Sequence, residues 1–244
     1  MDKEMKLSLH LAELRKRLIL ILVVLTVTMV GGIMISSGIL NYLRTLEPAN
    51  EISWNVFSPW DSLRLYLQIA LIFSVGISMP IILFQLWAFV RPGLSVEERG
   101  AAFRYIPLAT LLFLSGLLFA YFVVFQSAFH FAGELNNRMD LSETYGAAQY
   151  FSFMFNILLP VSLIFELPPL LMFLTKLRIL EPDLLRKFRR HAYFGLVVVS
   201  TFIAPPDFIS NIFIAVPLII LYELSVLLSV HIRRKQIERD HAFN

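Results

Sequence analysis

The residue with the clearest chemical potential in this sequence is a single glutamate inside a long apolar segment. Residues 144–165 carry no charge, and Glu166 follows them directly. A carboxylate at such a position is costly in hydrocarbon, so it must face water, a partner or the protein interior. We expect Glu166 to be a polar contact point for a ligand or partner helix. The alternative is a neutral, protonated glutamate that is bonded to a neighbouring helix.

Further carboxylates lie in the loops between apolar segments and in the last apolar segment. Glu97 and Glu98 could together accept a guanidinium group through paired hydrogen bonds. Ser95 with Glu98 also forms a capping box, so Glu98 alternatively only begins a helix. Asp207 follows two prolines and is typical of a turn or a helix cap. Glu223 lies nearer the basic C-terminus, where a long side chain can reach the membrane interface.

Signatures of known enzyme classes are missing. The sequence has no glycine-rich phosphate loop, no HExxH and no serine elbow. Cysteine is absent and the five histidines do not cluster. We therefore expect neither an enzyme nor a bound metal or cofactor.

The composition indicates a membrane protein. Hydrophobic residues make up 57% of the 244 residues and charged residues 16%, against about 25% charged in soluble domains. A bilayer core about 30 Å thick needs about 20 apolar residues per helix. The sequence predicts one transmembrane domain over residues 1–244, all-α, with six spans at about 18–40, 65–90, 105–127, 148–175, 192–206 and 208–230.

The last two spans are short, since Pro205, Pro206 and Asp207 interrupt one apolar stretch. They could instead form one re-entrant hairpin. Two crossings are favoured because this stretch is too long for a half-depth dip. Prolines inside the spans predict kinked helices and a curved wall.

The basic residues predict the orientation. Eighteen of the 21 Lys and Arg residues fall in the N-terminal segment, loop 91–104, loop 176–191 or the C-terminus. Loops rich in Lys and Arg face the cytoplasm, so both termini are expected there. Residues 7–17 form an amphipathic pattern with a Glu13–Arg17 pair at i,i+4, which predicts a helix in the cytoplasmic interface.

Five motifs, taken in order, resemble the TatC family, the polytopic receptor of the twin-arginine protein translocase. The resemblance runs from about His10 to about Ser229. The motifs are His10-Leu11-x-Glu13-Leu14-Arg15-x-Arg17, Gln85-x-Trp87-x-Phe89-x-x-Pro92-x-Leu94, Phe119-x-Tyr121-Phe122, Phe165-Glu166-x-Pro168 and Pro205-Pro206-Asp207.

The resemblance implies a function and a set of partners. It implies six helices in a glove-like arrangement in a bacterial-type cytoplasmic membrane. It also implies binding of paired-arginine signal peptides of folded precursors, transport driven by the proton-motive force, and assembly with TatA- and TatB-type single-span proteins. Membrane lipid and a homo- or hetero-oligomer are further expected partners, and nucleic acid is not.

The resemblance also assigns roles to individual residues. It implies that Glu166 contacts a partner helix and that Asp207 belongs to an extracytoplasmic loop. One departure from the family pattern is Arg91 before Pro92, which adds a positive charge near the implied signal-peptide site. The residues implied in signal-peptide binding are Glu98, Phe89, Glu13, Arg15, Glu97, Pro92 and Leu94.

Two other function classes remain open on the residues alone. A proton-coupled transporter could use Glu166 and Glu223 as a relay, but the sequence has no internal repeat of the kind that many transporters have. An intramembrane enzyme would need a nucleophile or metal set, and none is recognisable.

Overall fold

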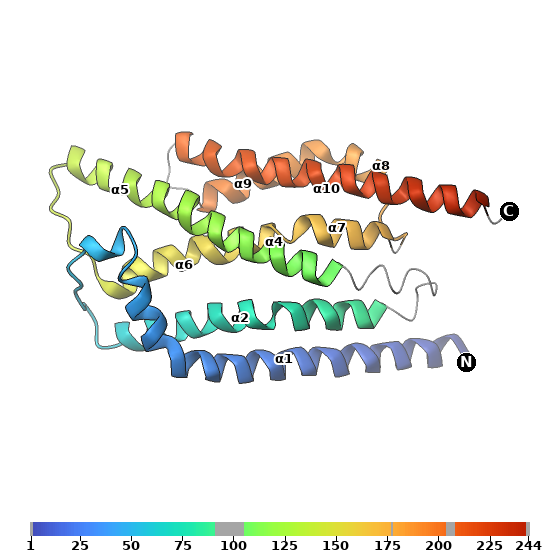
Figure 1. Cartoon of the computed structure of the whole chain (residues 1–244), viewed down its shortest axis with the longest axis horizontal. Helices are drawn as coiled ribbons and strands as arrows, with labels where there is room; N and C mark the ends of the chain where they lie inside the picture. Colours follow the sequence, from blue (N-terminus) through green and yellow to red (C-terminus); the bar gives the residue numbers. More distant parts are fainter. Residues whose placement is uncertain (1, 91–104, 177, 204–207, 243–244) are drawn as a thin grey trace. The chain divides into compact units, whose positions relative to one another are not determined.

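The computed structural model describes residues 2–90, 105–176, 178–203 and 208–242 (Figure 1). These residues are almost entirely helical and include no β-strand, which confirms the predicted all-α fold. The chain divides into two compact units, residues 1–110 and 111–244, and each is described by itself.

The first unit consists of two long helices and the segment that joins them. Helix α1 spans Asp2–Leu43 and α2 spans Asp61–Val90, with a short 3-10 helix η1 at Ala49–Glu51 between them. The Asp61 carboxylate accepts the Phe57 and Ser58 N–H groups at 3.1 and 3.0 Å, which fixes the start of α2. Residues 7–17, expected at the membrane surface, are part of α1 and continue without a break into its apolar stretch.

The second unit contains the remaining helices. Its elements are α4 (Tyr105–Phe119, which begins before the unit boundary), the π-helix η3 (Ala120–Phe125), α5 (Gln126–Arg138), α6 (Ala147–Ile164), α7 (Leu167–Lys176), α8 (Pro182–Lys187), α9 (Arg189–Ile203) and α10 (Phe208–Ala242). Its core is built on α6, whose Phe151, Met154 and Val161 are almost fully buried.

The outward surface of both units is apolar. Met34 is 80% exposed and Phe202 is 88% exposed. Soluble monomers rarely expose large continuous apolar patches. These helices therefore have the surface of a protein whose solvent is lipid.

Five helical stretches of the described chain are long and apolar enough to cross a membrane: Leu11–Leu43, Asp61–Phe89, Ile106–Arg138, Ala147–Lys176 and Ile214–Glu238. A sixth apolar helix, α9, has 15 residues, which gives a length of about 22 Å. The chain is therefore a multi-pass membrane protein, and its helix count agrees with the six spans expected from the sequence.

Candidate functional site

The two helices of the first unit pack antiparallel with a constant register. The Ser36 hydroxyl reaches the Tyr66 carbonyl at 3.3 Å, and the Thr28 hydroxyl bonds that of Ser74 at 2.8 Å. Between these pairs, a Cβ added to Gly32 would lie 2.9 Å from the Ala70 backbone. Successive contacts are therefore four residues apart on both helices and run in opposite directions along the two chains of residues.

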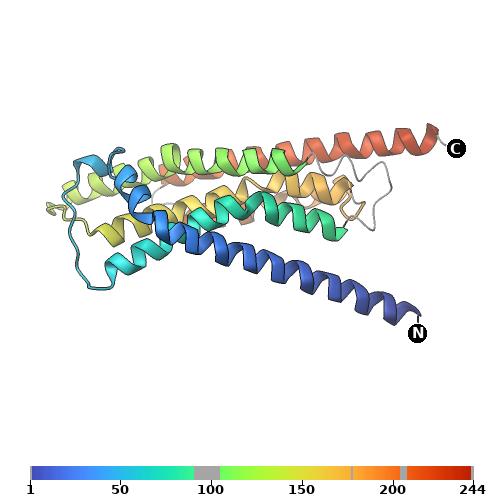
Figure 2. The same cartoon turned by 60° about the horizontal axis from the view of Figure 1, so that its bottom comes forward.

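The register continues toward the N-terminal end of α1. There the Arg17 guanidinium donates to Gln85 Oε1 at 3.3 Å and to Glu13 Oε1 at 2.5 Å. This confirms the predicted Glu13–Arg17 pair and adds a second helix to it. The two helices diverge toward this end (Figure 2), and these long side chains bridge them.

Continuing the same register brings Glu13 level with Phe89 at the end of α2. The Glu13 side chain is about one-third exposed, and its Oε2 has no hydrogen-bond partner among the described residues. Phe89 is half-buried, and Trp87 beside it is buried against Phe84 with ring centroids 5.5 Å apart. A carboxylate and an aromatic ring therefore lie at the same end of the unit.

Of the other residues predicted to bind the signal peptide, the structure describes only Arg15. Arg15 is exposed on α1, two residues from both Glu13 and Arg17, so it lies on a different face of the helix from that pair. Pro92, Leu94, Glu97 and Glu98 lie outside the described residues, as does Asp207 in the second unit. The predicted capping box at Ser95 and Glu98 lies outside them too.

Glu166 lies at a break between two helices. Helix α6 ends at Ile164 and α7 begins at Leu167. Pro168 and Pro169 lack the N–H groups that would bond the carbonyls four residues earlier, so the helix cannot run on unbroken. Gly116 of α4 lies against this break, since a Cβ there would be 2.9 Å from Phe165.

The Glu166 carboxylate is buried and incompletely bonded. Its residue is 9% exposed, and Oε1 has no hydrogen-bond partner among the described residues. An unsatisfied buried polar atom carries a free-energy penalty, and native structures retain few of them. Glu166 is thus a buried polar group whose Oε1 atom has no partner among the described residues.

The second intramembrane carboxylate has partners. Glu223 of α10 accepts the Arg189 guanidinium at 2.7 Å and the Tyr193 hydroxyl, both from α9. At the other end of this antiparallel helix pair, Asn211 bonds Ser200 and Thr201. Glu223 therefore closes a polar bridge between the last two helices rather than reaching the interface alone.

This bridge predicts a stability effect. Changing Glu223 to Ala should lower the free energy of unfolding in detergent by about 1–2 kcal/mol, because Arg189 and Tyr193 lose their acceptor. Glu223→Gln keeps an acceptor oxygen and should cost less. The exposed Glu134 gives the matched control, and equal unfolding curves for E223A and E134A would contradict the bridge.

Some features of the site have no simple sequence signal. The π-helix η3 places Tyr121 and Phe125 in an aromatic cluster with Tyr150, where the Phe125 and Tyr150 centroids are 5.5 Å apart. The Arg17–Gln85 and Arg189–Glu223 contacts join residues 68 and 34 positions apart.

Among the described residues, no group of three or more His, Cys, Asp or Glu side chains could hold a metal ion.

Comparison with known proteins identifies the family. The family model described as Sec-independent protein translocase protein (TatC) matches residues 9–217. A Sec-independent protein translocase protein TatC of Halalkalibacterium halodurans is 41% identical over 238 residues, which cover 98% of this chain and 94% of that protein. TatCy of Bacillus subtilis is 39% identical over 232 residues, covering 95% and 91%.

A solved structure agrees with these relatives. The crystal structure of the twin arginine translocase receptor TatC matches this chain with a TM-score of 0.78 and 30% identity, covering 92% of this chain and 99% of that one. The relatives are named as parts of a translocase, which is a transport system and not an enzyme. This chain belongs to the TatC family and is a component of the Sec-independent protein translocase.

Proposed function

We propose that this chain is the receptor of the translocase and that the end of the first unit binds the paired arginines of signal peptides. The observation that carries the proposal is the register of α1 and α2, which brings Glu13 level with Phe89. Loop 91–104, with Glu97 and Glu98, follows α2 directly. Carboxylates from two segments of the sequence would then meet the guanidinium groups.

The chemistry of the site favours arginine. A guanidinium has planar, paired donors that match a carboxylate, whereas an ammonium group is a point charge. Glu13 Oε1 is already held by Arg17, which fixes the carboxylate and leaves Oε2 for an incoming donor. Phe89 offers a ring face for the apolar residues that accompany the arginines. In this proposal Glu98 and Glu97 supply the second acceptor, and Pro92 and Leu94 shape the loop that carries them. Arg15 belongs to the same end of the first unit.

The rest of the pathway is proposed on the same basis. The basic segments support a cytoplasmic location for both termini, so the site would face incoming precursors. Glu166, buried without a described partner, would contact the signal or a TatA- or TatB-type single-span helix. Asp207 would lie in the last extracytoplasmic loop, and the short α9 would favour local thinning of the bilayer. The proton-motive force would drive transport.

A site-specific crosslink tests the location of the site. A photoreactive phenylalanine analogue at position 89 should capture a twin-arginine precursor in membrane vesicles, because the arginines bind next to this residue. The same analogue at Phe122, which is 58% exposed on the second unit, is the matched control and should capture less. Capture at Phe122 but not at Phe89 would contradict the proposed location.

The role of Glu13 and Glu98 in binding is best tested with substitutions that preserve the fold. Replacing Glu13 by Ala would leave the part-buried Arg17 without its carboxylate, so lost binding could reflect a local rearrangement. Glu13→Gln keeps an oxygen that accepts from Arg17 and removes only the charge. We expect E13Q and E98Q each to reduce capture at position 89, and undiminished capture in the double variant would contradict their role.

A further inference from the structure

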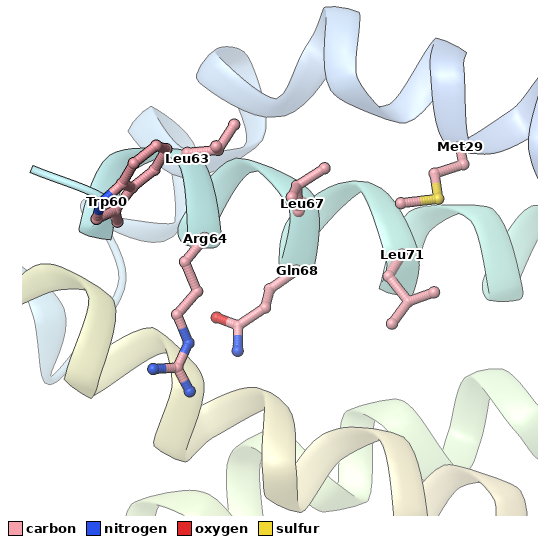
Figure 3. A pocket seen from close by; sticks show the side chains of 7 residues that line it. All are labelled: Met29, Trp60, Leu63, Arg64, Leu67, Gln68 and Leu71. Atoms are coloured by element: carbon pink, nitrogen blue, oxygen red, sulfur yellow. The ribbon is translucent and has the colours of Figure 1, made fainter.

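The start of α2, at the other end of the first unit from Glu13, carries a side groove with no assigned role. The groove has a volume of about 370 Å³ and is lined by Met29 of α1 and, from α2 and the residue just before it, Trp60, Leu63, Arg64, Leu67, Gln68 and Leu71 (Figure 3). Ligand pockets in proteins commonly have volumes of about 300–1,000 Å³. The groove is therefore large enough to hold part of a ligand.

The lining combines an apolar stripe with one cation. Leu63, Leu67 and Leu71 recur at i, i+4 and i+8, so they follow one side of the helix, and they are 51%, 40% and 45% exposed. Arg64 is exposed within the first turn of α2, and its guanidinium has no hydrogen bond or ion pair with any described residue. A cation that forms no ion pair with a described residue therefore lies at the head of an apolar groove.

The position along the helix fits a membrane boundary. Asp61 begins α2, and Trp60 just before it is 73% exposed. Tryptophan is enriched where hydrocarbon meets the headgroups, and arginine extends its charge to the same level. From Leu63 to Leu71 the helix rises about 12 Å at 1.5 Å per residue. This length is close to the thickness of one leaflet, about half of a 30 Å hydrocarbon core.

We propose that this groove binds one anionic phospholipid, with its phosphate on Arg64 and an acyl chain along Leu63, Leu67 and Leu71. The charge favours this occupant, because Arg64 lies at the headgroup end without an ion pair to any described residue and the leucines follow the length of the groove. A transmembrane helix of a partner would bring no anion to Arg64 at this level unless it carried an acidic residue there. The proposal depends only on the chain crossing a membrane and not on signal recognition.

Photolabelling in vesicles tests the site. The purified protein would be placed in phosphatidylglycerol vesicles containing phosphatidylglycerol with a photoreactive acyl chain, and labelled peptides would be mapped. Label should concentrate on residues 60–71 relative to the outward face around Met34, which is 80% exposed. Equal labelling of the two segments would overturn the proposal.

Variants separate the headgroup contact from the groove. Arg64→Gln should reduce labelling of residues 60–71 about fivefold, as expected for one basic residue at a membrane surface, and Arg64→Lys should retain most of it. Arg138→Gln removes a comparable exposed charge and should change nothing. Leu67→Trp should fill the groove and reduce labelling although Arg64 is intact.

A thermal measurement guards against misfolded variants. Added phosphatidylglycerol should raise the unfolding temperature of the wild-type protein in detergent, because a ligand that binds only the folded state stabilises it. Arg64→Gln should have the same unfolding temperature without lipid and a smaller rise with it. An equal rise of the unfolding temperature in both proteins would overturn the proposal. So would a crosslinker placed at position 67 that captures a protein, and not lipid, in native membranes.

Discussion

Replacing Gly32 by Val should separate α1 from α2 and lower the free energy of unfolding by about 1–3 kcal/mol, the usual cost of overpacking. A Cβ at this position would lie 2.9 Å from both the Cα and the carbonyl oxygen of Ala70. These are backbone atoms, so no side-chain rotation relieves the clash. Because the same contact sets the register of the two helices, signal-peptide binding should fall as well.

The adjacent glycine supplies the control. Gly31 is in the same helix and has nothing within 4 Å of an added Cβ. Gly31→Val should therefore leave both stability and binding close to wild type. Unfolding would be followed in detergent for both variants, and similar losses in G31V and G32V would show that the close contact with Ala70 does not hold the register.

Replacing Glu166 by Leu should have opposite effects on stability and on transport. The carboxylate is buried with Oε1 lacking a described partner, and such a group costs about 1–3 kcal/mol. An apolar side chain of similar size should remove this cost, so the unfolding free energy should stay the same or rise. Export of a twin-arginine precursor should fall more than about tenfold, which corresponds to a lost contact of about 1.4 kcal/mol.

The two readouts of this variant discriminate between its possible roles. If Glu166 only bonded a neighbouring helix, E166L would lose stability together with export. Glu134→Leu, which removes an exposed carboxylate of the same unit, should preserve export. A clear loss of stability in E166L would therefore contradict a role in contacting a partner or ligand.

The sequence predicts the features that depend on composition and local spacing. The length of the apolar runs predicts the membrane helices, and the i,i+4 spacing predicts the Glu13–Arg17 pair. The two prolines after Glu166 account for the break between α6 and α7, although the spacing alone indicated one span over about 148–175. The helix α1 begins at Asp2 and α10 extends to Ala242, because polar residues continue a helix beyond the hydrocarbon.

Contacts between helices are beyond such reasoning. The chain has no GxxxG motif, yet the missing Cβ of Gly32 allows a close approach to Ala70. Gln85 and Arg189 look like ordinary polar residues until the fold brings them to Arg17 and Glu223. The π-helix at Ala120–Phe125 adds one residue per turn within an apolar run, where hydrophobic periodicity carries no clear signal. These features depend on the partner surface, which a single sequence does not specify.

The proposed function requires that carboxylates at the end of the first unit bind paired arginines. The most direct test is the affinity of a synthetic twin-arginine signal peptide, compared with its twin-lysine counterpart, for the protein in lipid nanodiscs. Paired, charge-assisted hydrogen bonds predict binding about 10–100-fold weaker for the lysine peptide, and the E13Q/E98Q double variant should bind the two peptides alike. Equal affinity of the wild-type protein for both peptides would contradict recognition of the guanidinium groups by these carboxylates.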